Sequence, residues 1–175
     1  MRARRIAVVG PSGAGKDTLM RAAASALPEI CLLRRAITRP EDAGGEDFEG
    51  VTEAEFARRQ AAGDFVLNWD AHGLRYGVPQ MQGQGVWLVN LSRRVLPEAA
   101  QALPGLAVIH VTAAPEVLAA RLAERGRETA EDIAARIARE AEFDAAGLPV
   151  ITIDNSGALA DAEAAFIAAV QELSS

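Results

Sequence analysis

Short runs of apolar residues recur along the chain and are separated by longer stretches with amphipathic periodicity. The apolar runs predict five strands, at 6–9, 32–38, 86–91, 106–111 and 149–153. Most of these runs are too uniformly apolar for a sheet with one face in water, so they indicate a sheet that is buried on both faces.

The amphipathic stretches predict six helices, over 16–26, 53–62, 93–102, 115–124, 130–145 and 159–172. Thr52 and Thr129 each stand three residues before an acid, which is the spacing of a capping box at the start of a helix. Strands that alternate with helices favour an α/β fold, with a mostly parallel sheet covered by helices on both sides. The polar segment 38–52 shows no periodicity and predicts a functional loop or the edge of a small substrate lobe.

Composition narrows the class of protein. A chain of 175 residues predicts one domain over 1–175, and 50% hydrophobic with 24% charged residues is typical of a soluble globular protein. No export signal follows the basic start, and the lone Cys31 excludes an intramolecular disulfide, so we expect a cytoplasmic protein. A net charge of −6 argues against partners such as nucleic acid or an anionic membrane.

The segment "GPSGAGK" at 10–16 lies between a predicted strand and a predicted helix, which is the setting of a phosphate-binding loop. Its glycines let backbone N–H groups converge on phosphate oxygens, and Lys16, the only lysine of the chain, can reach the β and γ phosphates. We therefore expect ATP with Mg²⁺ as the bound nucleotide. The expected nucleotide-binding residues of this segment are Gly10, Pro11, Ser12, Gly13, Ala14, Gly15, Lys16, Asp17 and Thr18.

Asp17 stands where the usual pattern has the serine or threonine that binds the metal. Its carboxylate can also supply a hard oxygen ligand for Mg²⁺. Thr18 could take this role instead if the register of the helix shifted slightly. The sequence leaves both possibilities open.

A cluster of arginines follows the fourth predicted strand. Arg121 and Arg125 are four residues apart on one helical face, and Gly126 then breaks the helix. Arginines on a segment with a glycine hinge predict a lid, over about 121–136, that closes on phosphates. The alternative is a surface helix whose arginines pair with Glu124 and Glu128.

The two histidines have different expected roles. His110 lies within an apolar run and predicts a core side chain. His72 belongs to "HGLRYG", where a contact with a substrate and a purely structural turn are equally possible.

From end to end the chain resembles the guanylate kinase-like branch of the P-loop kinases. "GPSGAGK", "ITRP", "HGLRYGVP" and "LAERGRE" occur in that family's order and at similar spacing. The resemblance implies that Arg39 and Tyr76 contact the acceptor, and that Arg121, Arg125 and Arg136 bind nucleotide phosphates. Phe48 replaces that family's phosphate-binding tyrosine and Asn68 its guanine-reading glutamate, so guanine recognition is not expected.

The motifs "GKDTL", "VNLSR", "ERGRE" and "DNSGAL" are similar to those of the ribose 1,5-bisphosphate phosphokinases of phosphonate degradation. This resemblance implies transfer of the γ-phosphoryl group of ATP to ribose 1,5-bisphosphate, a small-molecule acceptor whose 5-phosphate is expected to receive it. We expect a monomer or homodimer. The resemblance also implies Lys16, Arg121 and Arg125 as catalytic residues, and Arg136 and Asn155 as further nucleotide contacts. The implied acceptor-binding residues are Arg35, Thr38, Arg39, Asn68, Tyr76 and Asn90 within an acceptor region of about 34–80.

Two other functions stay open at this stage. A guanylate or other nucleoside monophosphate kinase would share the phosphate loop and the lid. A non-catalytic guanylate kinase-like binding module would share the fold alone, although the intact Lys16 and the lid arginines weigh against it.

Overall fold

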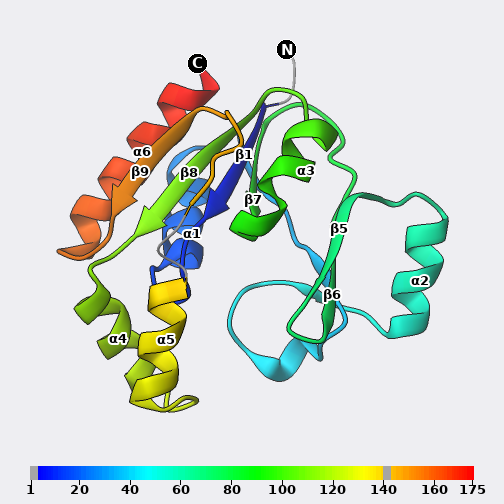
Figure 1. Ribbon diagram of the computed structural model, residues 1–175. Helices are drawn as coiled ribbons and strands as arrows, with labels where there is room; N and C mark the ends of the chain where they lie inside the picture. Colours follow the sequence, from blue (N-terminus) through cyan, green and yellow to red (C-terminus); the bar gives the residue numbers. More distant parts are fainter. Residues whose placement is uncertain (1–3, 140–142) are drawn as a thin grey trace.

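A parallel five-stranded sheet lies at the centre of the fold (Figure 1). We describe residues 4–139 and 143–175 of this computed structural model. The strands are β1 (Arg4–Val9), β2 (Ile30–Leu32), β7 (Val86–Asn90), β8 (Leu106–Thr112) and β9 (Val150–Asp154). They run in the order β2-β7-β1-β8-β9, and every neighbouring pair is parallel. The carboxyl ends of all five strands therefore meet at one edge of the sheet, where ligands bind in folds of this type.

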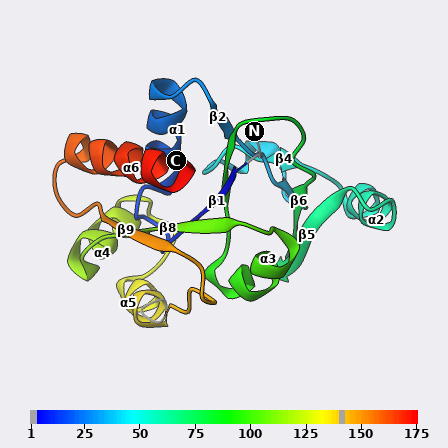
Figure 2. The ribbon, with the colours of Figure 1, turned by 90° about the horizontal axis from the view of Figure 1, so that it is seen from above.

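Helices cover both faces of this sheet, as the sequence predicts (Figure 2). On one face, α1 (Lys16–Ala26) and α6 (Leu159–Ser174) bury Leu19 and Phe166 against Ile6 and Ile109. On the other face, α3 (Leu96–Ala102) packs on Val9 and Val108. Two further helices, α4 (Pro115–Glu124) and α5 (Ala130–Arg139), lie side by side near the carboxyl edge (Figure 1).

A second, four-stranded sheet lies beside the first. It contains β3 (Ala36–Ile37), β4 (Glu49–Gly50), β5 (Phe65–Ala71) and β6 (Leu74–Pro79) in the order β4-β3-β6-β5. Helix α2 (Glu53–Ala61) buries Phe56 against Phe65 of this sheet. The short helix η1 (Glu41–Ala43) follows β3 within the polar segment that the sequence predicts to be a loop.

The predicted single strand over 32–38 is wrong, because its two ends belong to different sheets. Strand β2 pairs with β7 in the first sheet, and β3 pairs with β4 and β6 in the second. The two consecutive arginines between them explain the break. Arg34 turns to an exposed carboxylate at Asp47, whereas Arg35 is buried, so the chain passes from one sheet to the other here.

The β5–β6 hairpin has no counterpart among the predicted strands. His72 and Gly73 form its two-residue turn with φ of 53° and 73°. Positive φ at both central residues is the geometry of the tight turn that best fits twisted hairpin strands. The "HG" pair was the sequence signal for this hairpin. Of the two roles considered for His72, the structure shows the one in the turn.

Most predicted helices are confirmed to within two residues at each end. The exceptions are the stretch 93–102, which begins with the short helix η2 (Arg93–Val95) before α3, and the stretch 130–145. In the second, α5 ends at Arg139, residues 140–142 lie outside the described residues, and residues 143–145 are not helical. The threonine caps are confirmed, because Thr52 and Thr129 each accept a hydrogen bond from the third residue beyond. In the described ranges we find no helix that is long and apolar enough to cross a membrane.

Candidate functional site

The loop of residues 10–15 leaves β1 at the carboxyl edge of the sheet and leads directly into α1. Gly10 has φ of 148°, and a Cβ there would lie 2.0 Å from the carbonyl oxygen of Val111. Gly15 has φ of 90°, and its Cβ would lie 2.6 Å from Nδ2 of Asn155. Only glycine fits at these two positions, so the loop follows the neighbouring backbone closely and leads into a helix N-terminus, which is the geometry that binds an anion.

Asn155 and Arg121 hold this loop from behind. The buried Asn155 donates from Nδ2 to the carbonyl oxygen of Ala14 at 2.8 Å, and its own backbone N–H bonds to Thr112. Arg121 donates to the carbonyl oxygens of Gly13, at 3.0 Å, and of Asn155, at 2.6 Å. These bonds fix the shape of the loop, and the Arg121 guanidinium donates to backbone rather than to Glu124 or Glu128.

Lys16 begins α1 and turns back over the loop. Its Nζ donates to the carbonyl oxygens of Gly10 at 2.7 Å and of Pro11 at 3.3 Å. The ammonium group therefore lies at the mouth of the loop, beside the N-terminus of a helix, and both features attract negative charge. A hollow of about 450 Å³ adjoins the loop and is lined by Gly13, Gly15, Thr18, Arg121 and Arg125, among others.

A second hollow, of about 320 Å³, also adjoins the loop, and its lining has more arginines than acids. It joins Ser12 of the loop to four arginines, which are Arg39, Arg125, Arg127 and Arg136. Arg39 comes from the segment after β3, Arg125 and Arg127 lie between α4 and α5, and Arg136 belongs to α5. The predicted lid and acceptor region therefore meet here. Arg125 borders both hollows. Arg127 belongs to the arginine cluster of the sequence but was not expected as a site residue.

Arg136 is the lid arginine that pairs with an acid. Its guanidinium forms an ion pair with Glu128, which is half-buried at the same hollow. Arg136 thus forms an arginine–glutamate pair of the kind that the alternative describes, whereas Arg121 binds backbone carbonyl groups instead.

Arg39 reaches over the ring of Phe48, with its guanidinium carbon 4.4 Å from the ring centroid. It also donates to the carbonyl oxygen of Gly44 at 2.7 Å. The neighbouring Thr38 accepts a hydrogen bond from the backbone N–H of Arg75 at 2.8 Å and so ties β3 to the hairpin. Phe48 is buried and supplies a flat apolar face for the guanidinium.

Tyr76 lies beside Trp69, with ring centroids 5.2 Å apart and nearly parallel planes. The guanidinium of Arg35 lies over both rings. Arg35 is one of two buried polar residues in the described chain, the other being Asn155. Its NH2 donates to Glu46, whose second carboxylate oxygen accepts from Nδ2 of Asn90 at 3.4 Å. Glu46 thus joins two expected acceptor residues, a role that the sequence analysis missed.

Asn68 is not brought together with these residues. Neighbouring strand residues point to opposite faces, so Asn68 lies on the face of the hairpin away from Trp69 and Tyr76. Its Oδ1 accepts from Gln60 of α2 at 3.0 Å. Arg75 is on the same outer face, and its guanidinium lies over the Phe56 ring.

Asp17, in the first turn of α1, lies near Glu46 and Asn90 at a small hollow of about 100 Å³. Burial, together with the negative charge of Glu46, raises the pKa of Asp17, although Arg21 at 3.6 Å and Lys16 act in the opposite direction. Among the described residues no cluster of three or more acidic, histidine or cysteine side chains is arranged for a metal ion. A carboxylate oxygen at Asp17 still suits Mg²⁺, which binds few protein ligands when phosphates supply the others.

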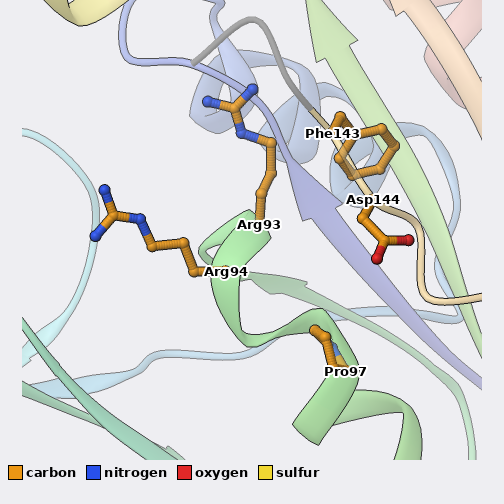
Figure 3. Close-up of a pocket in the computed structure, with 5 residues that line it drawn as sticks. All are labelled: Arg93, Arg94, Pro97, Phe143 and Asp144. Carbon is orange, nitrogen blue, oxygen red and sulfur yellow. The ribbon is translucent and has the colours of Figure 1, made fainter. Parts of the chain in front are cut away.

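A further hollow, of about 410 Å³, lies beside the start of α3 (Figure 3). Arg93 and Arg94 extend from η2 in different directions on one side of it, and Phe143 and Asp144 lie on the other side. Phe143 stacks on His110 at 4.5 Å. His110 is only half-buried, so the predicted core side chain is partly open to solvent. Burial, with the charges of Arg93 and Lys16, lowers the pKa of His110.

Comparison with known proteins agrees with this arrangement. Residues 6–143 match the family model described as AAA domain. The chain is 47% identical to a ribose 1,5-bisphosphate phosphokinase of Brucella melitensis, over 96% of this chain and 92% of that protein. It is 52% identical to a protein of the same name from Ruegeria sp., over 90% of this chain and 86% of that protein.

The chain belongs to the ribose 1,5-bisphosphate phosphokinase family. Among solved structures, the guanylate kinase of Anaplasma phagocytophilum superposes with a TM-score of 0.65 at 18% identity, covering 99% of this chain and 87% of that chain. This likeness shows that the family member described here has the guanylate kinase-like P-loop kinase fold.

Proposed function

We propose that the protein transfers the γ-phosphoryl group of ATP to ribose 1,5-bisphosphate, forming 5-phosphoribosyl 1-diphosphate and ADP. The observation that carries this proposal is the hollow lined by four arginines directly beside the phosphate loop. An acceptor with two phosphates and no base needs cationic partners, because paired guanidinium–phosphate contacts are strong and directional. The names of the relatives support the same reaction.

The accepting group is the 1-phosphate and not the 5-phosphate, since the product carries its diphosphate at C1. A phosphate oxygen is already anionic at neutral pH, so the reaction needs no strong general base. Catalysis then consists of alignment and neutralisation of charge in a site that excludes water. The protein supplies these through the loop, the lid and the second sheet.

Each group of residues has a distinct part in this proposal. Backbone N–H groups of the glycine loop and the Lys16 ammonium bind the β and γ phosphates. Arg125 and Arg136 compensate the charge on the group in transfer, and Arg39 binds the 1-phosphate of the acceptor. Arg121 acts mainly by positioning, because its donors already bind the carbonyl oxygens of Gly13 and Asn155.

Asp17, at the hollow of about 100 Å³, is the proposed protein ligand of Mg²⁺. Thr18, at the hollow of about 450 Å³, is the alternative. When bound, Mg²⁺ would neutralise part of the charge on the β and γ phosphates. The proposal treats 1–175 as one domain, in which about 34–80 bind the acceptor and about 121–136 form the lid. A cytoplasmic location fits it because ATP is the phosphoryl donor.

The test incubates the purified protein with MgATP and either ribose 1,5-bisphosphate or GMP, and follows the products by phosphorus NMR. We expect a diphosphate signal from the sugar and no GDP. The Lys16→Ala variant should give no detectable turnover at unchanged circular dichroism, because the ammonium that reaches the phosphates is removed. GDP as the only product would overturn the proposed acceptor, and normal turnover by Lys16→Ala would overturn the proposed phosphate loop.

A further inference from the structure

Arg35, directly before β3, is the one charged residue of the described chain that is buried. Its side chain is 7% exposed, and the rings of Trp69 and Tyr76 cover one side of it. A buried charge is costly unless an anion pairs with it. In this structure the anion is Glu46, which also accepts a hydrogen bond from Asn90.

Glu46 does not satisfy all the hydrogen-bond donors of Arg35. The Nε–H of Arg35 is buried and has no hydrogen-bond partner in the described structure. The Glu46 carboxylate accepts from NH2 of Arg35 and from the amide of Asn90, and the Nε–H of Arg35 is left without an acceptor within the described part of the chain. A phosphate group has three acceptor oxygens and can engage Nε and NH2 together while still accepting from Asn90.

Glu46 stands on a segment that can release it. The residues around it from Glu41 to Asp47 are exposed, and Gly44 and Gly45, directly before it, both have positive φ. Glu46 itself forms part of the wall of the arginine-lined hollow and of the small hollow at Asp17. Movement of its side chain into solvent would therefore open a passage from the arginine-lined hollow to Arg35 and Asn90.

We propose that Arg35 and Asn90 form a subsite for the unreacted 5-phosphate of the acceptor, and that Glu46 occupies this subsite until the phosphate displaces it. The choice of the 5-phosphate follows from position. Arg39 lines the hollow that contains Ser12 and the lid arginines, as the reacting phosphate requires, whereas Arg35 lies behind Glu46 and does not line it. The assignment of the phosphate rests on the proposed function, because it presumes an acceptor with two phosphates.

Substitution of a residue that contacts a ligand ordinarily weakens binding, whereas substitution of Glu46 should strengthen binding of the acceptor. If Glu46 competes with the phosphate, the Glu46→Gln variant should bind the acceptor more tightly, because a neutral amide pairs less strongly with Arg35. If Glu46 instead bound the sugar directly, the same variant should bind it more weakly. The sign of the change separates the two roles.

The experiment measures binding of ribose 5-phosphate and of ribose 1-phosphate by calorimetry, without ATP, so that no turnover is needed. We expect Glu46→Gln to bind ribose 5-phosphate about tenfold more tightly than the unaltered protein, as loss of one competing charge-assisted hydrogen bond implies. The matched control is Asp47→Asn, which removes one negative charge from the same segment, where Asp47 pairs with the exposed Arg34. Its affinity should stay within about twofold of the unaltered protein.

A second variant checks the subsite itself. In the Glu46→Gln background, Arg35→Lys should remove the gain, because an ammonium cannot donate two parallel hydrogen bonds from a plane. Thermal unfolding of each variant shows whether it is folded before binding is measured.

Equal or weaker binding of ribose 5-phosphate by Glu46→Gln would overturn the proposed competition. A gain for ribose 1-phosphate alone would overturn the choice of the 5-phosphate. An equal gain in Asp47→Asn would show that net charge, and not this subsite, determines affinity. The expected gain in a protein that does not phosphorylate ribose 1,5-bisphosphate would leave the subsite standing and refute the proposed reaction.

Discussion

Asn155 offers the sharpest test of how the phosphate loop keeps its shape. Its side chain is 3% exposed and donates one hydrogen bond, to the carbonyl oxygen of Ala14 at 2.8 Å. The Asn155→Ala variant removes this donor, so the carbonyl oxygen of Ala14 loses its hydrogen bond from Nδ2. The other amide atom, Oδ1, is buried without a partner among the described residues, so its removal offsets part of the loss.

A buried acceptor left without its donor costs about 1–3 kcal/mol, and after this offset we expect a loss in the free energy of unfolding of about 1–2 kcal/mol. For a chain of this size that loss lowers Tm by about 2–8 °C. Because the affected carbonyl belongs to the loop, KM for ATP should rise by about 5- to 30-fold if the whole loss reappears in binding. KM for the acceptor should change much less.

Thermal unfolding and steady-state kinetics with varied ATP test this expectation. The matched control is Asn68→Ala, which removes an exposed asparagine that is hydrogen-bonded to Gln60, and its unfolding free energy should change by less than about 0.5 kcal/mol. If Asn155→Ala unfolds at the same temperature as Asn68→Ala and keeps its KM for ATP, Asn155 does not hold the loop.

Two further predictions concern the metal and the pH dependence of stability. Asp17→Asn should raise the Mg²⁺ concentration needed for half-maximal turnover, because an amide is a weaker ligand than a carboxylate; an unchanged requirement would favour Thr18 as the ligand. The pKa of His110 is lowered from 6.5 by burial and by the charges of Arg93 and Lys16, so the folded protein holds it neutral while the unfolded chain takes up a proton as the pH falls through about 6.5. Stability should therefore fall between about pH 7 and 5.5, and His110→Phe, which keeps a ring against Phe143, should show a shallower fall in Tm; equal slopes for the two proteins would contradict this.

Local sequence patterns were sufficient for the central sheet and its helices. Uniform apolar runs predicted β1, β7, β8 and β9, since a parallel strand buried on both faces has no polar alternation to obscure it. The start of α1 and the caps at Thr52 and Thr129 were predictable because glycine loops and capping boxes act within a few residues. The phosphate loop belongs to the same class, and both Lys16 and the glycines could be found without the structure.

The second sheet was harder to predict. Strands β3 and β4 have two residues each, and their pairing joins segments that are far apart in sequence, so no local period marks them. The hairpin carried a signal in His72 and Gly73. Its outward face, however, carries the polar Asn68, Asp70 and Arg75, and these residues interrupt the apolar pattern that marks a strand. Asn68 was expected at the site because it replaces the guanine-reading glutamate of guanylate kinases, and only the alternation along β5 shows that it faces α2.

What the sequence determined by itself is the class of chemistry: one lysine in a glycine loop, a carboxylate after it, and arginines spaced for a lid. What only the tertiary structure decided is which charges meet. It placed Arg121 on loop carbonyls, gathered Arg39, Arg125, Arg127 and Arg136 at one hollow, and paired the buried Arg35 with Glu46. These contacts join residues from separate elements, and the energy of a buried charge depends on all of its neighbours, which spacing along the chain does not encode.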